Sequence, residues 1–129
     1  MPTAIENLLT LFPLKPWRWY ELSSNPAVSV EFIAANRDLP WVWHMVPQNP
    51  NINLDFVAAN MDLPWNWEGF SFHTIITPEF VADNTDLPWN WDFLSKNPII
   101  TADLVAENPE LPWNWKLLST NPGLFVDSN

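Results

Sequence analysis

The sequence predicts an all-α solenoid in which pairs of short helices stack with a 24-residue repeat. Three observations support this class. The motif Pro-Trp-x-Trp recurs five times at constant spacing, it contains all ten Trp, and helix-capping residues recur at fixed positions beside it. The alternation typical of β-strands is rare, so strands are the less favoured alternative. The motif occurs at residues 16–19, 40–43, 64–67, 88–91 and 112–115.

The repeat also predicts how the chain is organised. We expect a single repeat domain over residues 1–129, because helix pairs this short bury their apolar faces only by stacking on neighbouring repeats. Residues 1–16 are expected to form an N-terminal cap and residues 17–112 four full repeats. Residues 113–129 then form a partial fifth repeat and a C-terminal cap, in which Leu124, Phe125 and Val126 either fold back or leave an adhesive end.

The first helix of each repeat is expected to begin at the proline of the motif, because proline is favoured in the first helical turn. The acidic residue two positions earlier would then place negative charge at the helix N-terminus. The second Trp of each motif lies three residues before an apolar residue, which predicts that this Trp belongs to the core. The first Trp points about 200° away around such a helix, so we expect it at a seam or partly exposed.

The second helix of each repeat is expected to begin after a residue that favours N-caps, and these residues are Ser29, Asn53, Thr77 and Thr101. An acidic residue follows two positions later, at Glu31, Asp55, Glu79 and Asp103. The helix is expected to end at an asparagine in the left-handed conformation, at Asn36, Asn60, Asn84 and Asn108. The side chains of these four residues should satisfy buried backbone groups between repeats. In the N-terminal cap, Thr3 is the expected N-cap and Leu8 and Leu9 belong to the apolar face.

The unit Trp-Asn-Trp-Asp-Phe-Leu-Ser-Lys-Asn-Pro-Ile-Ile-Thr at residues 89–101 resembles the Trp-rich tandem repeats of uncharacterised proteins of giant DNA viruses. The similarity covers about residues 17–122 and implies a viral origin, but it implies no activity. The 24-residue period and the recurring Asn-Pro step also resemble leucine-rich variant repeats, which stack α and 3₁₀ helices into a right-handed superhelix. The chain departs from that second family by carrying Trp at the positions of small aliphatic residues and by lacking its cysteine cluster.

Composition excludes several classes of function. The 129 residues carry a formal net charge of -10, which argues against direct binding to nucleic acid. No apolar run approaches the ~18 residues of a membrane span, so no membrane contact is expected. The absence of cysteine and of a recognisable signal favours an intracellular setting, in the cytoplasm of a virus-infected host cell or in the virion, over secretion. His44 and His73 occupy different repeat positions, so we predict no catalytic residue, metal site or cofactor, and no enzyme.

The candidate binding residues form two repeated sets. The acidic set is Asp38, Asp62, Asp86 and Glu110, and the aromatic set is Trp41, Trp65, Trp89 and Trp113. Acidic residues could steer a basic partner, and Trp is enriched in binding hot spots, although helix capping, solubility and core packing explain the same residues. The leading hypothesis is a non-enzymatic scaffold that binds a protein partner. The alternatives are a structural component of a virus particle that associates head to tail, and a carbohydrate-binding module.

Overall fold

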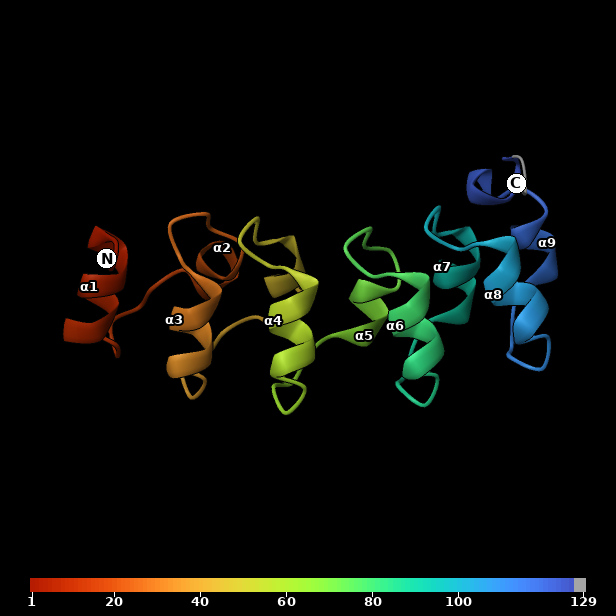
Figure 1. Cartoon of the computed structure of the whole chain (residues 1–129). Helices are drawn as coiled ribbons and strands as arrows, with labels where there is room; N and C mark the ends of the chain where they lie inside the picture. The colour runs from red at the N-terminus through yellow and green to blue at the C-terminus, as the bar shows by residue number, and fades with distance from the viewer. Residues whose placement is uncertain (127–129) are drawn as a thin grey trace. The chain divides into compact units, whose positions relative to one another are not determined.

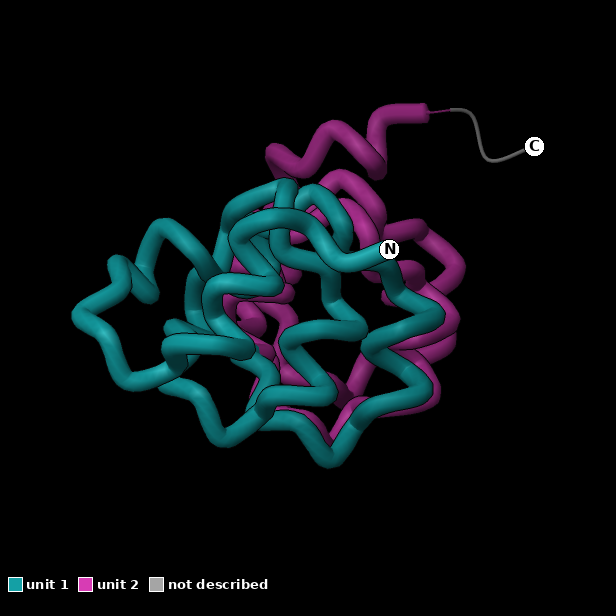
Figure 2. Tube along the Cα trace, turned by 90° about the vertical axis from the view of Figure 1, so that its left-hand side faces the viewer, with its two compact units in different colours: residues 1–66 teal, residues 67–129 magenta. Residues whose placement is uncertain are grey.

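The computed structural model describes residues 1–126, and this part of the chain contains helices and turns but no strand (Figure 1). The prediction of an all-α fold is therefore confirmed. The chain divides into two compact units, residues 1–66 and residues 67–129 (Figure 2). A solenoid that continues through both units, and a single domain over residues 1–129, stay predictions.

Both units consist of short helices that follow the 24-residue repeat. Unit 1 contains α1 (Ala4–Leu11), α2 (Trp19–Ser23), α3 (Val30–Ala35), the 3₁₀ helix η1 (Val46–Gln48) and α4 (Leu54–Ala59). Unit 2 contains α5 (Trp67–Phe70), α6 (Pro78–Asp83), α7 (Trp91–Lys96), α8 (Ala102–Glu107), α9 (Trp115–Leu118) and the 3₁₀ helix η2 (Pro122–Leu124).

The second helices α3, α4, α6 and α8 begin where the sequence predicts. The side chains of the four N-cap residues each accept a hydrogen bond from the backbone N–H three residues later, at 2.8–3.2 Å; these residues are Ser29, Asn53, Thr77 and Thr101. One acidic residue lies in the first turn of each helix, where it stabilises the positive end of the helix dipole.

The same helices end at the predicted asparagines, but the predicted conformation is wrong. The φ angles of the four C-cap residues lie between -124° and -135°, so none is left-handed; these residues are Asn36, Asn60, Asn84 and Asn108. Each Nδ2 instead donates to the carbonyl four residues earlier, at 2.9 Å. The carboxamide therefore satisfies a carbonyl at the end of its own helix rather than a group between repeats.

The predicted start of the first helix is also wrong, because α2, α5, α7 and α9 begin at the second Trp of the motif. Before it, the N–H of the first Trp bonds to the carbonyl two residues earlier at 2.8 Å, in a γ-turn centred on the proline. The fixed φ of proline suits this turn as well as it suits a helix. In α7 and α9 the residue between the two Trp is the N-cap, and Asn90 and Asn114 each accept a backbone N–H.

This later helix start reverses the predicted burial of the two Trp. The first Trp is 5–6% exposed in four motifs, at Trp41, Trp65, Trp89 and Trp113, so the expectation of partial exposure is wrong. The second Trp is half-buried at Trp19, Trp43 and Trp91, 58% exposed at Trp115 and buried only at Trp67. The helical angle between the two rings does not apply, because the first Trp lies in the extended segment ahead of the helix.

Each buried first Trp is held by the repeat before it. Its ring meets the second Trp of the preceding motif edge to face, with centroids 5.1–5.5 Å apart; the pairs are Trp19–Trp41, Trp43–Trp65, Trp67–Trp89 and Trp91–Trp113. Its Nε1 donates to the carbonyl of the asparagine that ends the preceding second helix, at 2.8–2.9 Å. The Trp motif therefore joins neighbouring repeats inside each unit.

Polar groups between repeats are satisfied by the asparagine of the Asn-Pro step. In unit 2, Nδ2 of Asn121 donates to the carbonyls of Ser95 and Asn97, each at 2.8 Å, and Asn97 makes the same kind of contact with residues 71 and 73. In unit 1, Nδ2 of Asn49 reaches the carbonyls of residues 23, 25 and 28. These side chains are 1–2% exposed, so they supply the bonds that the sequence analysis assigned to the other asparagine column.

The predicted N-terminal cap is confirmed at Thr3, which caps α1 in a capping box with Glu6. The Glu6 carboxylate also accepts the backbone N–H and the hydroxyl of Ser29 at 2.8 and 3.0 Å, so it ties the start of α1 to the start of α3. Leu9 is fully buried, whereas Leu8 is 42% exposed and does not belong to the buried face.

The other end of the described chain is less covered. Phe125 and Val126 are each 71% exposed, and Leu124 is half-buried. The remainder of the predicted C-terminal cap, residues 127–129, lies outside the described residues.

Candidate functional site

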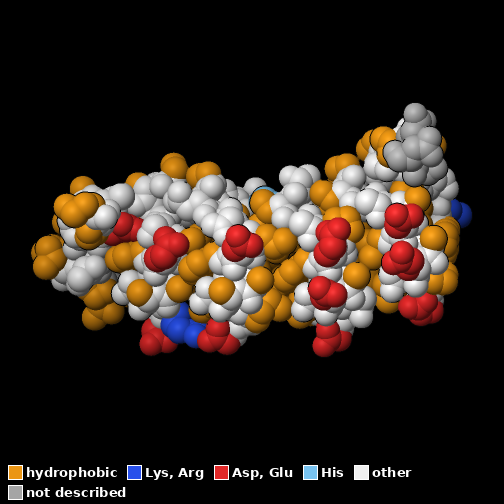
Figure 3. All heavy atoms as spheres, viewed as in Figure 1, with side chains coloured by type: hydrophobic (Ala, Val, Ile, Leu, Met, Phe, Trp, Pro, Cys, Tyr) orange, Lys and Arg blue, Asp and Glu red, His pale blue; other side chains and the backbone are white. Residues whose placement is uncertain are grey.

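Most acidic side chains in the described part of unit 2 lie on the second helices, α6 and α8, and on the turns that follow them (Figure 3), while Glu68 and Asp92 lie on α5 and α7. Residues 78–87 and 102–111 contain six acidic residues and no Lys or Arg. The two Lys of unit 2, Lys96 and Lys116, lie on α7 and α9 instead. The face formed by α6 and α8 therefore carries six negative charges without a basic residue among them.

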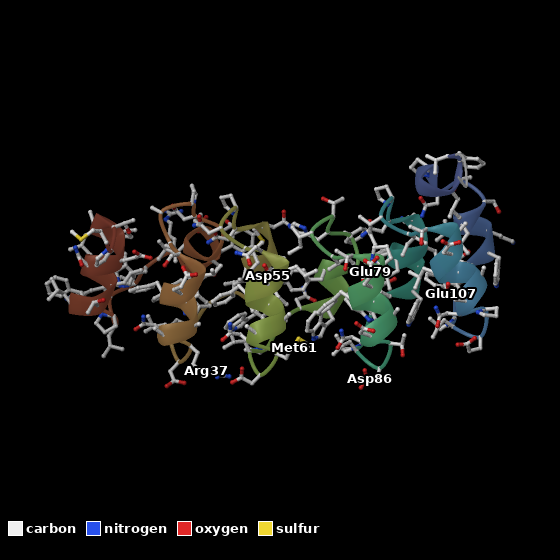
Figure 4. All side chains as sticks on the ribbon, viewed as in Figure 1. Arg37, Asp55, Met61, Glu79, Asp86 and Glu107 are labelled. Carbon is white, nitrogen blue, oxygen red and sulfur yellow. The ribbon has the colours of Figure 1, made fainter. Side chains whose placement is uncertain are left out.

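A groove of about 330 Å³ lies on this face between α6 and α8. Three carboxylates line it, from Glu79 on α6 and from Asp103 and Glu107 on α8. All three residues are exposed, and Figure 4 shows Glu79 and Glu107 on these neighbouring helices. The rest of the lining is Thr101 and three apolar residues, Pro78, Ala82 and Leu104, of which Leu104 is 5% exposed. The groove thus combines an apolar floor with a carboxylate rim.

The predicted acidic set lies in turns rather than at helix N-termini. In each case the residue after the acid bonds its N–H to the carbonyl of the C-cap asparagine, at 3.0–3.3 Å, which closes a turn. Asp38 and Asp62 belong to unit 1 and Asp86 and Glu110 to unit 2, and all four are exposed. The expected role as helix-capping charges is therefore wrong for this set, because the helix begins later than predicted.

Unit 1 has the same face with a weaker charge. Its second helices and following turns, residues 30–39 and 54–63, carry four acidic residues and Arg37. Arg37 donates to a carboxylate oxygen of Asp62 at 2.8 Å and to its carbonyl at 3.0 Å. This hydrogen bond holds the pKa of the Asp62 carboxyl below its ordinary value. Part of the acidic set in unit 1 is thus neutralised within the unit.

Two further acids of unit 2 were missed by the sequence analysis, because they do not recur in every repeat. Asp83 and Glu107 stand where unit 1 has Ala35 and Ala59. The available signal was the spacing of four residues between Asp103 and Glu107, which places both on one helix face. A search for repeated positions passes over a charge that only one unit carries.

The predicted aromatic set does not reach the surface, since these four Trp rings are 5–6% exposed and lie against the preceding repeat. The histidines also have structural surroundings. Nδ1 of His73 accepts the N–H of Ile75 at 3.1 Å, which reproduces the turn made by asparagine in the other repeats. His44 lies beside Tyr20, with ring centroids 6.0 Å apart.

Residues 1–126 contain no group of three or more His, Asp or Glu placed to hold a metal ion. No helix in this described range is long and apolar enough to cross a membrane. No family model, curated protein or solved structure matches the chain.

Proposed function

We propose that the protein is a non-enzymatic interaction protein that binds a basic segment of a partner protein on the α6–α8 face of unit 2. The observation that carries this proposal is the concentration of six acidic residues, without Lys or Arg, around a groove with three carboxylates. Such a face raises the local concentration of cations and steers a basic partner toward it.

The chemistry of the groove favours an arginine side chain. The aliphatic stem of Arg packs on apolar surface while its charged end stays in contact with water, and Leu104, Pro78 and Ala82 supply that surface. A guanidinium binds carboxylates through paired hydrogen bonds, and the rim offers carboxylates from two helices. Lysine presents a single compact charge and would use this arrangement less fully.

The test is the affinity of unit 2 in the full-length protein for a short Arg-rich peptide, followed by fluorescence anisotropy. We expect binding to weaken strongly between about 50 mM and about 300 mM salt, because salt screens exposed charges. The triple variant Glu79→Gln, Asp103→Asn, Glu107→Gln should lose at least about tenfold in affinity, which corresponds to about 1.4 kcal/mol.

The matched control removes three charges from the corresponding face of unit 1, with Glu31→Gln, Asp38→Asn and Asp55→Asn. This variant has the same net charge as the first, so a loss below about threefold would assign the binding to unit 2. Equal losses of affinity in the two variants would show that binding depends on net charge alone. Binding that does not change with salt would contradict the proposal. Circular dichroism checks that both variants keep their helices.

The structural alternative, a component that associates through its ends, is favoured by a separate observation. Eleven large hydrophobic side chains are exposed in the described chain, and eight of them lie in residues 1–14 or 115–126. The carbohydrate-binding alternative depended on exposed first Trp residues, and their burial leaves it without a supporting observation.

A further inference from the structure

We infer that the last described repeat of unit 2 binds the N-terminal helix α1 of a second copy of the chain. The site is a groove of about 500 Å³ bounded by α8, α9 and η2. Seven of the eight residues that line it are apolar, among them Val105, Trp115, Leu118 and Leu124. This groove is separate from the acidic groove between α6 and α8, so the inference does not depend on the proposed function.

Residues at three of the groove positions are buried one repeat earlier. The residues 24 positions before Val105, Leu118 and Leu124 are Val81, Leu94 and Ile100, and their side chains are 0–1% exposed. Trp91, which corresponds to Trp115, packs edge to face against Trp113 of the next repeat. The groove of the last described repeat is therefore lined by positions that belong to the contact between repeats one repeat earlier.

The helix α1 holds the same place in the repeat as the second helices α3, α4, α6 and α8. Its C-cap residue Phe12 occupies the position of the asparagine that ends each second helix, and its carbonyl accepts Nε1 of Trp17 at 2.8 Å as the asparagine carbonyls do. In the described chain, α1 has no first helix before it, and one of its faces stays uncovered. Leu8, Leu11 and Leu14 are 42%, 68% and 94% exposed there and in the turn that follows.

Charge also favours contact between these two regions. Lys15 and Arg18 follow α1, and the one acidic residue of the first 20 positions, Glu6, is buried. Glu110 lies in the turn after α8, next to the groove residue Pro109, whereas Asp103 and Glu107 line the separate groove between α6 and α8. A second copy therefore offers both an apolar helix and a basic flank that suit the groove.

Sedimentation velocity of the full chain, from about 1 μM to about 1 mM, tests the contact. We expect the wild-type protein to associate with rising concentration. Leu11→Asp and Trp115→Gln should each raise the dissociation constant at least about tenfold, because a desolvated charge or lost aromatic area weakens the contact. Tyr20→Asp is the matched control, since Tyr20 is an exposed aromatic residue outside both surfaces, and it should leave association unchanged.

An equimolar mixture of Leu11→Asp and Trp115→Gln chains distinguishes head-to-tail contact from other modes. Each variant keeps the surface that the other lacks, so the mixture should form a dimer at concentrations at which neither variant associates alone. Association of either variant alone at the concentrations at which the mixture forms a dimer would show contact between like ends and overturn the inference. A monomeric wild-type protein at the highest concentration, a monomeric mixture or a loss of association in the control would also overturn it. Leu14→Asp replaces Leu11→Asp if that chain does not fold.

Discussion

The beginning of unit 1 and the end of unit 2 are covered by their surroundings to different extents. At the beginning, the Glu6 carboxylate is 4% exposed and accepts hydrogen bonds from Thr3 and Ser29, which closes the first repeat against α1. At the end, Trp115 and Phe125 are 58% and 71% exposed beside an apolar groove. Trp91 holds the position of Trp115 one repeat earlier and is half-buried against Trp113, so the same residue type at the same position is covered by the repeat next to it.

The largest expected difference in stability is between alanine substitutions of the two Trp in the last motif, Trp113 and Trp115. Trp113→Ala should reduce the free energy of unfolding of unit 2 by about 3–5 kcal/mol, because the ring is buried and packs against Trp91. Trp115→Ala should cost below about 1 kcal/mol, since that ring is mostly exposed. Urea denaturation followed by circular dichroism measures both, and equal losses would contradict the difference in burial.

A smaller effect is expected for the asparagines of the Asn-Pro step. Asn121→Ala should cost about 2–3 kcal/mol, because it leaves the buried carbonyls of Ser95 and Asn97 without their donor. Asn25 is half-buried and its Oδ1 accepts the N–H of Ala27, so Asn25→Ala should cost about 1 kcal/mol. Urea denaturation measures both losses. If Asn25→Ala costs as much as Asn121→Ala, the expected difference between the two positions is contradicted.

The smallest expected effect is on the pH dependence of stability, through Glu6 at the beginning of unit 1. Burial raises the pKa of the Glu6 carboxyl, but the hydrogen bonds from Ser29 and Thr3 outweigh it and hold the pKa below its ordinary value of 4.5. The folded state therefore gains stability that is complete above that value and is lost as the pH falls through the lowered pKa. Glu6→Gln should cost about 1–2 kcal/mol at neutral pH and remove this acid-dependent loss.

Thermal unfolding between pH 7 and pH 2 checks this prediction, with Asp92→Asn as the control because Asp92 is an exposed acid of unit 2. The melting temperatures of the wild-type protein and of Glu6→Gln should change differently with pH only below pH 4.5, where the Glu6 carboxylate takes up its proton. A variant curve parallel to that of the wild type would remove Glu6 as the source of acid sensitivity.

The sequence predicted the features that depend on neighbouring residues. The N-caps at Ser29, Asn53, Thr77 and Thr101 follow from side-chain chemistry within three residues, and the structure confirms them. The start of the first helix could not be predicted in this way, because the φ of proline fits both a γ-turn and a helix. That one choice decides the burial of both Trp of the motif, so the error extended from Pro88 to Trp89 and Trp91.

The candidate site was predicted in part. Repetition indicated exposed acids at Asp86 and Glu110, and the structure places both on the surface of unit 2. Repetition could not indicate Glu107, which lines the groove with Asp103 but has alanine at the corresponding position of unit 1. The departures from the repeat therefore locate the region where the two units differ in charge.

The sharing of Trp pairs between neighbouring repeats has a consequence for how such a chain can change length. Each ring pair combines the second Trp of one motif with the first Trp of the next, and the spacing is 24 residues throughout. Excision of residues 91–114 would join Asn90 to Trp115 and restore the motif Pro-Trp-Asn-Trp, while the Trp67–Trp89 pair stays intact. Duplication or loss of one 24-residue segment thus adds or removes a complete pair and leaves no unmatched ring, whatever the position of the breakpoint.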